Sequence, residues 1–121
     1  MILALNSGSA HGSPLMGGTG PADAATDTLV RNLAGEIGPH GVRVLGVWVA
    51  GIPEKLTKVN SSMPVDESTI QGLLGHLDSM RITRRSPRLA EVVRTLVFLA
   101  SDAAAGITGT FVNATSMPLG S

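Results

Sequence analysis

Side chains able to carry out hydrolytic chemistry gather near the start of this chain. Two serines, a histidine and two aspartates fall within one short stretch: Ser7, Ser9, His11, Asp23 and Asp27. A serine hydroxyl attacks an ester carbonyl when a histidine takes its proton and an aspartate orients that histidine. Backbone N–H groups of a Gly/Ser-rich loop near a helix N-terminus would stabilise the oxyanion that forms. A small serine-dependent hydrolase of esters or lactones, built on the loop from Ser7 to Asp27, is therefore one hypothesis.

The same stretch also has a simpler interpretation. A nucleophile elbow follows the pattern Gly-x-Ser-x-Gly, and the segment from Asn6 to Ala10 (NSGSA) lacks one of the two glycines. A catalytic triad is defined by geometry, which spacing along one sequence does not supply. We therefore favour a polar loop that caps the following helix over a catalytic triad.

Several other functional classes are disfavoured by composition. The chain has no cysteine, which excludes thiolate chemistry and disulfides. Its three histidines follow no metal-ligand spacing, so we expect no metal site. Nine acidic and nine basic residues give a formal net charge of zero, which provides no argument for a nucleic-acid or membrane partner. No apolar run approaches the roughly 20 residues of a membrane span, and we expect a cytoplasmic protein.

The apolar pattern predicts alternating strands and helices. Three apolar runs predict strands, at residues 2–5, 42–49 and 110–114. Three further segments predict helices, at residues 21–37, 67–80 and 88–100. Pro21 suits the first helical turn, and Gly38 suits a glycine cap at the end of that helix. The order predicts an α/β fold in one domain spanning residues 1–121: a βαβαβ half of a doubly wound, Rossmann-like parallel sheet.

Charged side chains are expected on solvent-facing surfaces. Asp27 and Arg31 are four residues apart, which predicts a weak ion pair on the polar face of the first helix. Four arginines lie just before or at the start of the last predicted helix, and we expect their side chains to be solvent-exposed: Arg81, Arg84, Arg85 and Arg88.

Three segments together resemble a known family. They are Leu29 to Val44 (LVRNLAGEIGPHGVRV), Glu91 to Asp102 (EVVRTLVFLASD) and Ile107 to Asn113 (ITGTFVN). In this order and spacing they resemble the C-terminal half of a short-chain dehydrogenase/reductase. They are similar to the helix and strand after the active-site tyrosine, the penultimate helix and the start of the final strand. The resemblance implies an oxidoreductase lineage with NAD or NADP as cofactor.

The residues at the family's catalytic positions depart from its pattern. The resemblance places Ser7 at the catalytic serine, Thr19 at the tyrosine and Asp23 at the lysine, and the chain contains no tyrosine at all. A threonine hydroxyl is far less acidic than a phenol, whose pKa is about 10, and is a poor proton donor. An acid in place of the lysine reverses the local charge. The pattern indicates a divergent pseudoenzyme lacking Tyr-x-x-x-Lys, which we expect to be unable to perform Tyr/Lys-assisted hydride transfer alone.

The resemblance also implies a cofactor-binding region after the second strand. Trp48, Gly51 and Ile52 match positions that border the family's nicotinamide pocket, although core packing explains Trp48 equally well. Residues 53–80 match the family's substrate loop. The phosphate-binding glycine loop and the residue that separates NAD from NADP belong to the family's N-terminal half. Cofactor choice therefore stays open, and weak binding of a nucleotide or another small ligand is expected.

The first strand is expected to have an unpaired edge. In the family it lies inside the sheet, beside a strand from the N-terminal half that this chain does not contain. Proteins normally cover an apolar edge strand. We expect a homo-oligomer, a dimer paired through the first strand, or a complementing chain, unless the chain is a truncated product of a longer reading frame. A non-catalytic assembly module is accordingly a third functional hypothesis.

Overall fold

The computed structural model describes residues 1–55 and 66–119 of the chain. Its strands are β1 (Ile2–Ser7), β2 (Val44–Val49) and β3 (Phe111–Asn113). Its helices are α1 (Thr19–Ile37), α3 (Glu67–Ser79) and α4 (Leu89–Ala100), with short 3-10 helices η1 (Gly8–His11), η2 (Gly38–His40) and η3 (Asp102–Ala104). The three strands are parallel in the order β1-β2-β3. The predicted half of a doubly wound sheet is confirmed.

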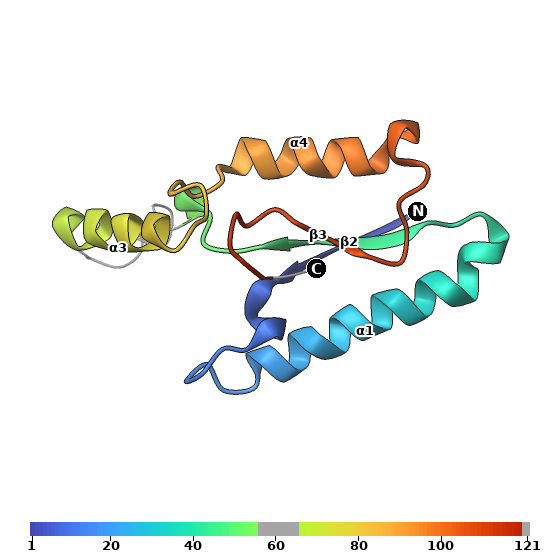
Figure 1. Ribbon diagram of the computed structural model, residues 1–121, viewed down its shortest axis with the longest axis horizontal. Helices are drawn as coiled ribbons and strands as arrows, with labels where there is room; N and C mark the ends of the chain where they lie inside the picture. Colours follow the sequence, from blue (N-terminus) through green and yellow to red (C-terminus); the bar gives the residue numbers. More distant parts are fainter. Residues whose placement is uncertain (56–65, 120–121) are drawn as a thin grey trace.

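The sheet lies between two helices. Figure 1 shows α1 on one face and α4 on the other, with α3 beyond the end toward which the strands run. The central strand β2 is covered on both faces, and the residues from Val44 to Trp48 are all buried. Alternate side chains of β2 enter two separate cores. Val44 and Trp48 pack under α1, whereas Leu45 and Val47 pack under α4. Residues far apart in the sequence therefore meet at the carboxyl ends of the strands.

The structure shifts the expected starts of two helices and changes the conformation of one expected cap. α1 begins at Thr19, two residues before Pro21, because Pro21 still falls in the first turn, where a missing N–H costs no hydrogen bond. α1 ends at Ile37 with Gly38 as its C-cap residue, as expected, but Gly38 is right-handed with φ −53° and leads into η2 instead of adopting the usual left-handed conformation of a glycine cap. The left-handed glycine is Gly41, with φ 78°. Arg88 precedes α4 as its N-cap residue.

Two further sequence expectations can be compared with the described residues. The helix expected at residues 67–80 is α3, which ends one residue earlier. Of the expected substrate loop at residues 53–80, positions 56–65 lie outside the described residues. Within residues 1–55 and 66–119, no helix is long and apolar enough to cross a membrane.

A glycine in the central strand allows close packing on the α1 face of the sheet. Gly46 pairs with Phe111 across β2 and β3. A Cβ atom placed on Gly46 would fall within 3.0 Å of three ring atoms of Phe111. The Phe111 ring then stacks on Trp48, with ring centroids 5.5 Å apart and planes 11° apart. Gly46 is thus needed for the aromatic pair beneath α1.

Candidate functional site

A cluster of hydroxyl and carboxylate groups lies at the carboxyl end of β1. Ser7 ends the strand, Ser9 lies in η1, and Asp23 lies in the first part of α1. The two serine side chains are 2.7 Å apart at their Oγ atoms, and both donate hydrogen bonds to Oδ2 of Asp23. The backbone N–H of Ser9 also donates to Oγ of Ser7 at 3.2 Å. The structure therefore brings together three residues that the sequence had singled out.

The electrostatics of this cluster follow from its hydrogen bonds. The hydroxyl groups of Ser7 and Ser9 lower the pKa of Asp23 below its usual value, because they stabilise the carboxylate more than the acid. Asp23 is consequently anionic at neutral pH. Both serine hydroxyls direct their protons to this carboxylate. The site thus has a fixed negative charge at the position that the resemblance assigned to a lysine.

A second polar network lies beneath the first. The amide of Asn6 donates to the backbone carbonyl of Asp23 at 2.9 Å and to Oδ1 of Asp27 at 2.7 Å. The indole N–H of Trp48 lies 3.2 Å from Oδ2 of Asp27. Asp27 is only 5% exposed, so the expected surface pair with Arg31 is wrong. The guanidinium of Arg31 instead lies over the ring of Phe111, 5.6 Å from its centroid.

A cavity of about 760 Å³ opens beside the serine cluster. Its walls come from η1, the segment after β2, the end of α3 and the segment after β3, and they include Ser7, Ser9, His11, Gly51, Leu77 and Leu119. This volume is within the usual range for small-molecule sites. The carboxyl edge of an open parallel sheet is also where such folds bind ligands. The cavity is therefore the best candidate for a binding site in the part of the chain that the structure describes.

The remaining predicted site residues have different positions. His11 lines the cavity and packs edge-on against Trp48, with ring centroids 4.4 Å apart. Trp48 itself is 1% exposed and lies behind that histidine. Thr19 and Ile52 are not among the residues that line this cavity. The hydroxyl of Thr19 donates to the carbonyl of Met16 at 2.6 Å on the exposed first turn of α1.

Arg81 forms part of the cavity wall from a buried position. It is 1% exposed, so the expectation of a solvated side chain is wrong. Its guanidinium donates to the carbonyls of Thr115 at 2.8 Å, Ala50 at 2.9 Å and Gly51 at 3.2 Å. Its Nε also donates to Oγ of Ser86 at 3.2 Å. Burial lowers the pKa of Arg81 from its very high ordinary value, and the charge of a nearby aspartate partly opposes this effect. Arg81 thus joins the segments that follow β2 and β3.

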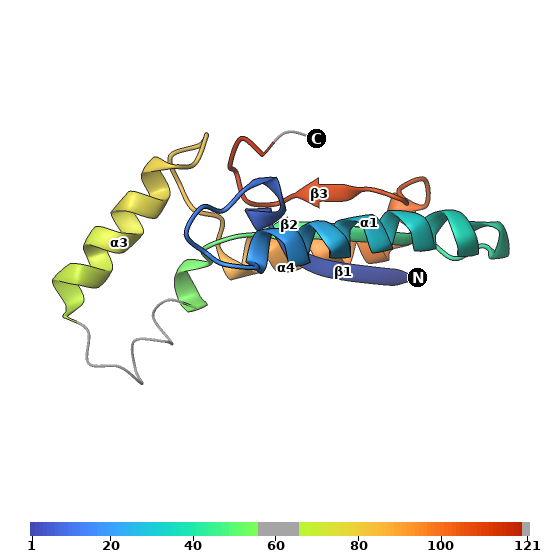
Figure 2. The same ribbon diagram turned by 90° about the horizontal axis from the view of Figure 1, so that it is seen from below.

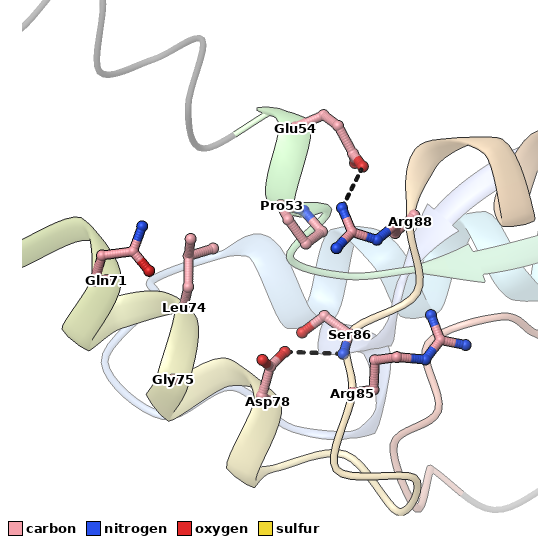
Figure 3. Close-up of a pocket in the computed structure, with 9 residues that line it drawn as sticks. All are labelled: Pro53, Glu54, Gln71, Leu74, Gly75, Asp78, Arg85, Ser86 and Arg88. Carbon is pink, nitrogen blue, oxygen red and sulfur yellow. Dashed lines mark hydrogen bonds and ion pairs between the residues drawn. The ribbon is translucent and has the colours of Figure 1, made fainter. Parts of the chain in front are cut away.

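A second hollow, of about 400 Å³, lies between α3 and the start of α4 (Figure 3). Its charged side chains already have partners within the chain. Arg88 lies 3.8 Å from Glu54, and the carboxylate of Asp78 accepts the N–H of Ser86 at 2.9 Å. Arg85 also lines the hollow, and its guanidinium forms a bidentate ion pair with the carboxylate of Glu91, at 2.5 and 2.8 Å. These contacts stabilise the approach to α4, and the larger cavity is the better ligand site.

Sequence reasoning missed two buried polar residues that hold the site together, Asn6 and Arg81. Asn6 is a polar residue at the end of an apolar strand, and that contrast was the available signal. Arg81 carried no signal, because its pattern does not distinguish it from the three neighbouring arginines. Among the described residues, no group of three His, Asp or Glu side chains is placed to hold a metal ion.

Comparisons with known proteins agree with this architecture. A family model described as enoyl-(acyl carrier protein) reductase matches residues 1–114. The enoyl-(acyl-carrier-protein) reductase (NADH) FabI of Synechocystis is 33% identical over 93 residues, which are 77% of this chain and 33% of that protein. The FabI protein of Nostoc is 34% identical over 90 residues. The chain spans about a third of the length of these curated relatives.

Solved structures show the same fold. The enoyl-acyl carrier protein reductase of Bacillus cereus, crystallised with NADP+ and an indole naphthyridinone, matches with a TM-score of 0.76 at 28% identity. That match covers 98% of this chain and 44% of the other. Sorbitol-6-phosphate 2-dehydrogenase from Erwinia amylovora matches with a TM-score of 0.78 at 21% identity, over 99% of this chain and 48% of the other. The chain therefore belongs to the enoyl-(acyl carrier protein) reductase family of short-chain dehydrogenases/reductases.

Proposed function

We propose that this chain binds a small ligand weakly in the cavity beside Ser7 and Ser9 and does not transfer hydride on its own. The observation that carries the proposal is the anionic carboxylate of Asp23, held by both serine hydroxyls. Reduction of a carbonyl or enoyl group develops negative charge on oxygen, which catalysts stabilise with a proton donor or a positive charge. A carboxylate in that position opposes the developing charge.

The cavity supports binding of part of a nicotinamide nucleotide. The Synechocystis relative is named for its use of NADH, and the Bacillus cereus reductase was crystallised with NADP+. The nicotinamide of such a cofactor supplies hydride when it is bound. In this chain the hydroxyls of Ser7 and Ser9 and the backbone at Gly51 would hold its polar groups, and Leu77 and Leu119 would contact its ring. These residues combine an apolar wall with a few polar groups, as small-molecule sites do.

The first test is a titration of the purified chain with NADH and NADPH. Trp48 is the chain's single tryptophan and contacts His11, which lines the cavity, so its fluorescence should report occupancy. Calorimetry gives the stoichiometry. Saturable binding is the expected result, and no change in either signal would reject the proposal. Oxidation of NADPH by the chain alone, with any carbonyl or enoyl substrate, would reject the claim that the chain does not transfer hydride on its own.

A matched pair of variants assigns the signal to the cavity. Met16 lines the cavity and is 60% exposed, whereas its neighbour Leu15 is fully exposed and is not among the lining residues. Met16→Glu adds a negative charge at the cavity mouth and should weaken binding of the anionic nucleotide roughly fivefold to tenfold. Leu15→Glu adds the same charge next to it and should leave the affinity unchanged. Equal losses in the two variants would place the binding elsewhere.

The second candidate function is a serine-dependent hydrolase. It is favoured by the presence of Ser7, Ser9 and His11 on the wall of one cavity. In the described structure the serines donate to Asp23, and His11 packs on Trp48, so the imidazole would have to turn toward a serine to act as a base. Hydrolysis of an activated ester by the wild type, Ser7→Ala and Ser9→Ala tests this function. Equal rates in all three would end the hypothesis.

A further inference from the structure

The walls of the large cavity meet beyond the carboxyl end of the sheet. Figure 2 shows η1 and the segment after β3 close together there, with α3 farther out in the same direction. Leu119 of that segment packs closely on Gly8 of η1, because a Cβ atom placed on Gly8 would lie 2.6 Å from Cδ1 of Leu119. Groups from the start and from the end of the chain can therefore contact one small ligand.

The end of the cavity beside β1 presents hydrogen-bond acceptors. Ser7 and Ser9 line the cavity, and both hydroxyls donate to the carboxylate of Asp23, which as an anion can only accept. One lone pair on Oγ of Ser7 also accepts the N–H of Ser9. The lone pairs that remain on the two oxygens are acceptors, with the negative charge of Asp23 directly behind them. A ligand group that binds here must donate hydrogen bonds, and an ammonium group does so with the complementary charge.

The wall formed by Arg81 presents a positive charge. The four groups that accept hydrogen bonds from its guanidinium are three carbonyls and one hydroxyl, all of them uncharged. A guanidinium has five N–H donors, so one N–H on Nη1 remains. The carboxylate of Asp78 raises the pKa of Arg81, but it accepts the N–H of Ser86 and forms no ion pair with Arg81 in the described part of the chain. Because buried charges are normally paired, a ligand carboxylate is the expected partner of this guanidinium.

The two polar ends lie on neighbouring strands. Ser7 is the register partner of Val49, and Ala50 follows directly. The carbonyl of Ala50 accepts a hydrogen bond from Arg81 at 2.9 Å. One strand spacing and one such hydrogen bond put the serine oxygens and the guanidinium on the order of 8 Å apart. A ligand that bonds to both must carry its ammonium and carboxylate close together, as an α-amino acid does.

The remaining wall of the cavity is largely apolar. It comes from the loop before α1, the end of α3 and the segment after β3: Met16, Leu77, Met80, Met117 and Leu119. Methionine side chains adapt to the shape of a ligand. An aliphatic side chain of the ligand would be buried against these residues, which favours an apolar amino acid over a polar one.

We propose that the cavity binds a zwitterion, an apolar α-amino acid, with its ammonium at Ser7 and Ser9 and its carboxylate at Arg81. The inference rests on the proposed function, because it names the class of small ligand that the same cavity takes. Each charge of such a ligand meets the opposite charge of the chain. An amine or a carboxylic acid alone would use only one of the two ends.

Three ligands that differ by one charged group test the proposal on the wild-type chain. L-Leucine carries both charges, isoamylamine lacks the carboxylate, and isocaproate lacks the ammonium. Calorimetry measures the affinities, and the fluorescence of Trp48, which contacts His11 on the cavity wall, reports occupancy. L-Leucine should bind, and each of the other two should bind at least about fivefold more weakly. Equal affinity for L-leucine and either single-charge ligand would overturn the proposal.

A matched pair of variants assigns the ammonium contact to Asp23. Asp23→Asn removes the charge and keeps the size of the side chain. It should weaken binding of L-leucine and isoamylamine roughly fivefold to tenfold and leave that of isocaproate unchanged. Asp66→Asn is the control, because Asp66 also accepts hydrogen bonds from a serine, Ser68, but at the exposed N-terminus of α3 and not on the cavity wall. Equal affinities of the two variants for L-leucine would overturn the proposal.

Titration with NADH separates this inference from the proposed function. L-Leucine should compete with NADH, because both would occupy the same cavity. Binding of both ligands at once would place L-leucine elsewhere and overturn the inference. Binding of NADH without binding of L-leucine would also overturn it, while the proposed function would stand. If neither ligand bound, both proposals would fall.

Discussion

The buried arginine at the cavity wall offers the sharpest test of the structure. Arg81→Met keeps a long apolar side chain but removes all four hydrogen bonds, and it leaves the carbonyls of Ala50 and Thr115 without their donor. A hydrogen bond from a charged donor contributes about 1.5–3 kcal/mol. The two shortest bonds alone therefore account for about 3–6 kcal/mol. Relief of the cost of burying the guanidinium offsets part of this. We expect the free energy of unfolding to fall by about 2–4 kcal/mol.

Urea unfolding, followed by Trp48 fluorescence and circular dichroism, measures the change. Arg84→Met is the matched control, because Arg84 is exposed and donates a hydrogen bond to the carbonyl of Ser79 at the surface. We expect that variant to lie within about 0.5 kcal/mol of the wild type. Arg81→Lys retains the charge but not the planar set of guanidinium donors, so its free energy of unfolding should lie between those of Arg81→Met and Arg84→Met. Equal unfolding free energies for Arg81→Met and Arg84→Met would refute the role assigned to this arginine.

Three further predictions concern the core and the ion pairs. Gly46→Ala should lower the unfolding free energy by about 1–3 kcal/mol, because its methyl group collides with Phe111, and thermal unfolding measures this. Asp27→Leu leaves two buried donors unsatisfied and should cost about 1–3 kcal/mol, with a shifted tryptophan emission; unchanged emission and stability would contradict the network. The pair with Arg85 lowers the pKa of Glu91 from 4.5 to about 2, so its stabilisation is full above pH 4.5 and is lost as the pH falls toward 2. Glu91→Gln should therefore make the melting temperature depend less steeply on pH between pH 5 and pH 2.5. An unchanged slope of melting temperature against pH would contradict this.

The arrangement of strands and helices was largely predictable from the sequence. The apolar run of β2 has no polar alternation, which indicates a strand covered on both faces, and the structure buries it between α1 and α4. Element boundaries were less predictable. The first helix begins at Thr19 rather than Pro21, and the left-handed glycine is Gly41 rather than Gly38. The exact end of a helix depends on the dihedral angles of a few residues, and the spacing of apolar residues along the sequence does not report those angles.

The candidate site was predictable in part. Ser7 and Ser9 were singled out by residue type, and their shared contact with Asp23 is explained by proximity, since the strand end, η1 and the start of α1 are adjacent in the chain. The hypotheses of weak ligand binding and of hydrolysis stay predictions, for the experiments above to decide. The cavity itself could not be predicted, because its walls come from four separated segments.

By itself the sequence determined the family and the parallel α/β order, because both depend on local patterns of apolar residues, glycines and short motifs. The environment of individual charges was decided by tertiary structure alone. Asp27 is buried by partners 21 positions away in both directions, and Arg81 binds a carbonyl 34 positions away. Helical spacing placed Asp27 on a polar face, yet β1 brings Asn6 and β2 brings Trp48 to its carboxylate. Burial of a charge depends on such distant partners, which no local pattern contains.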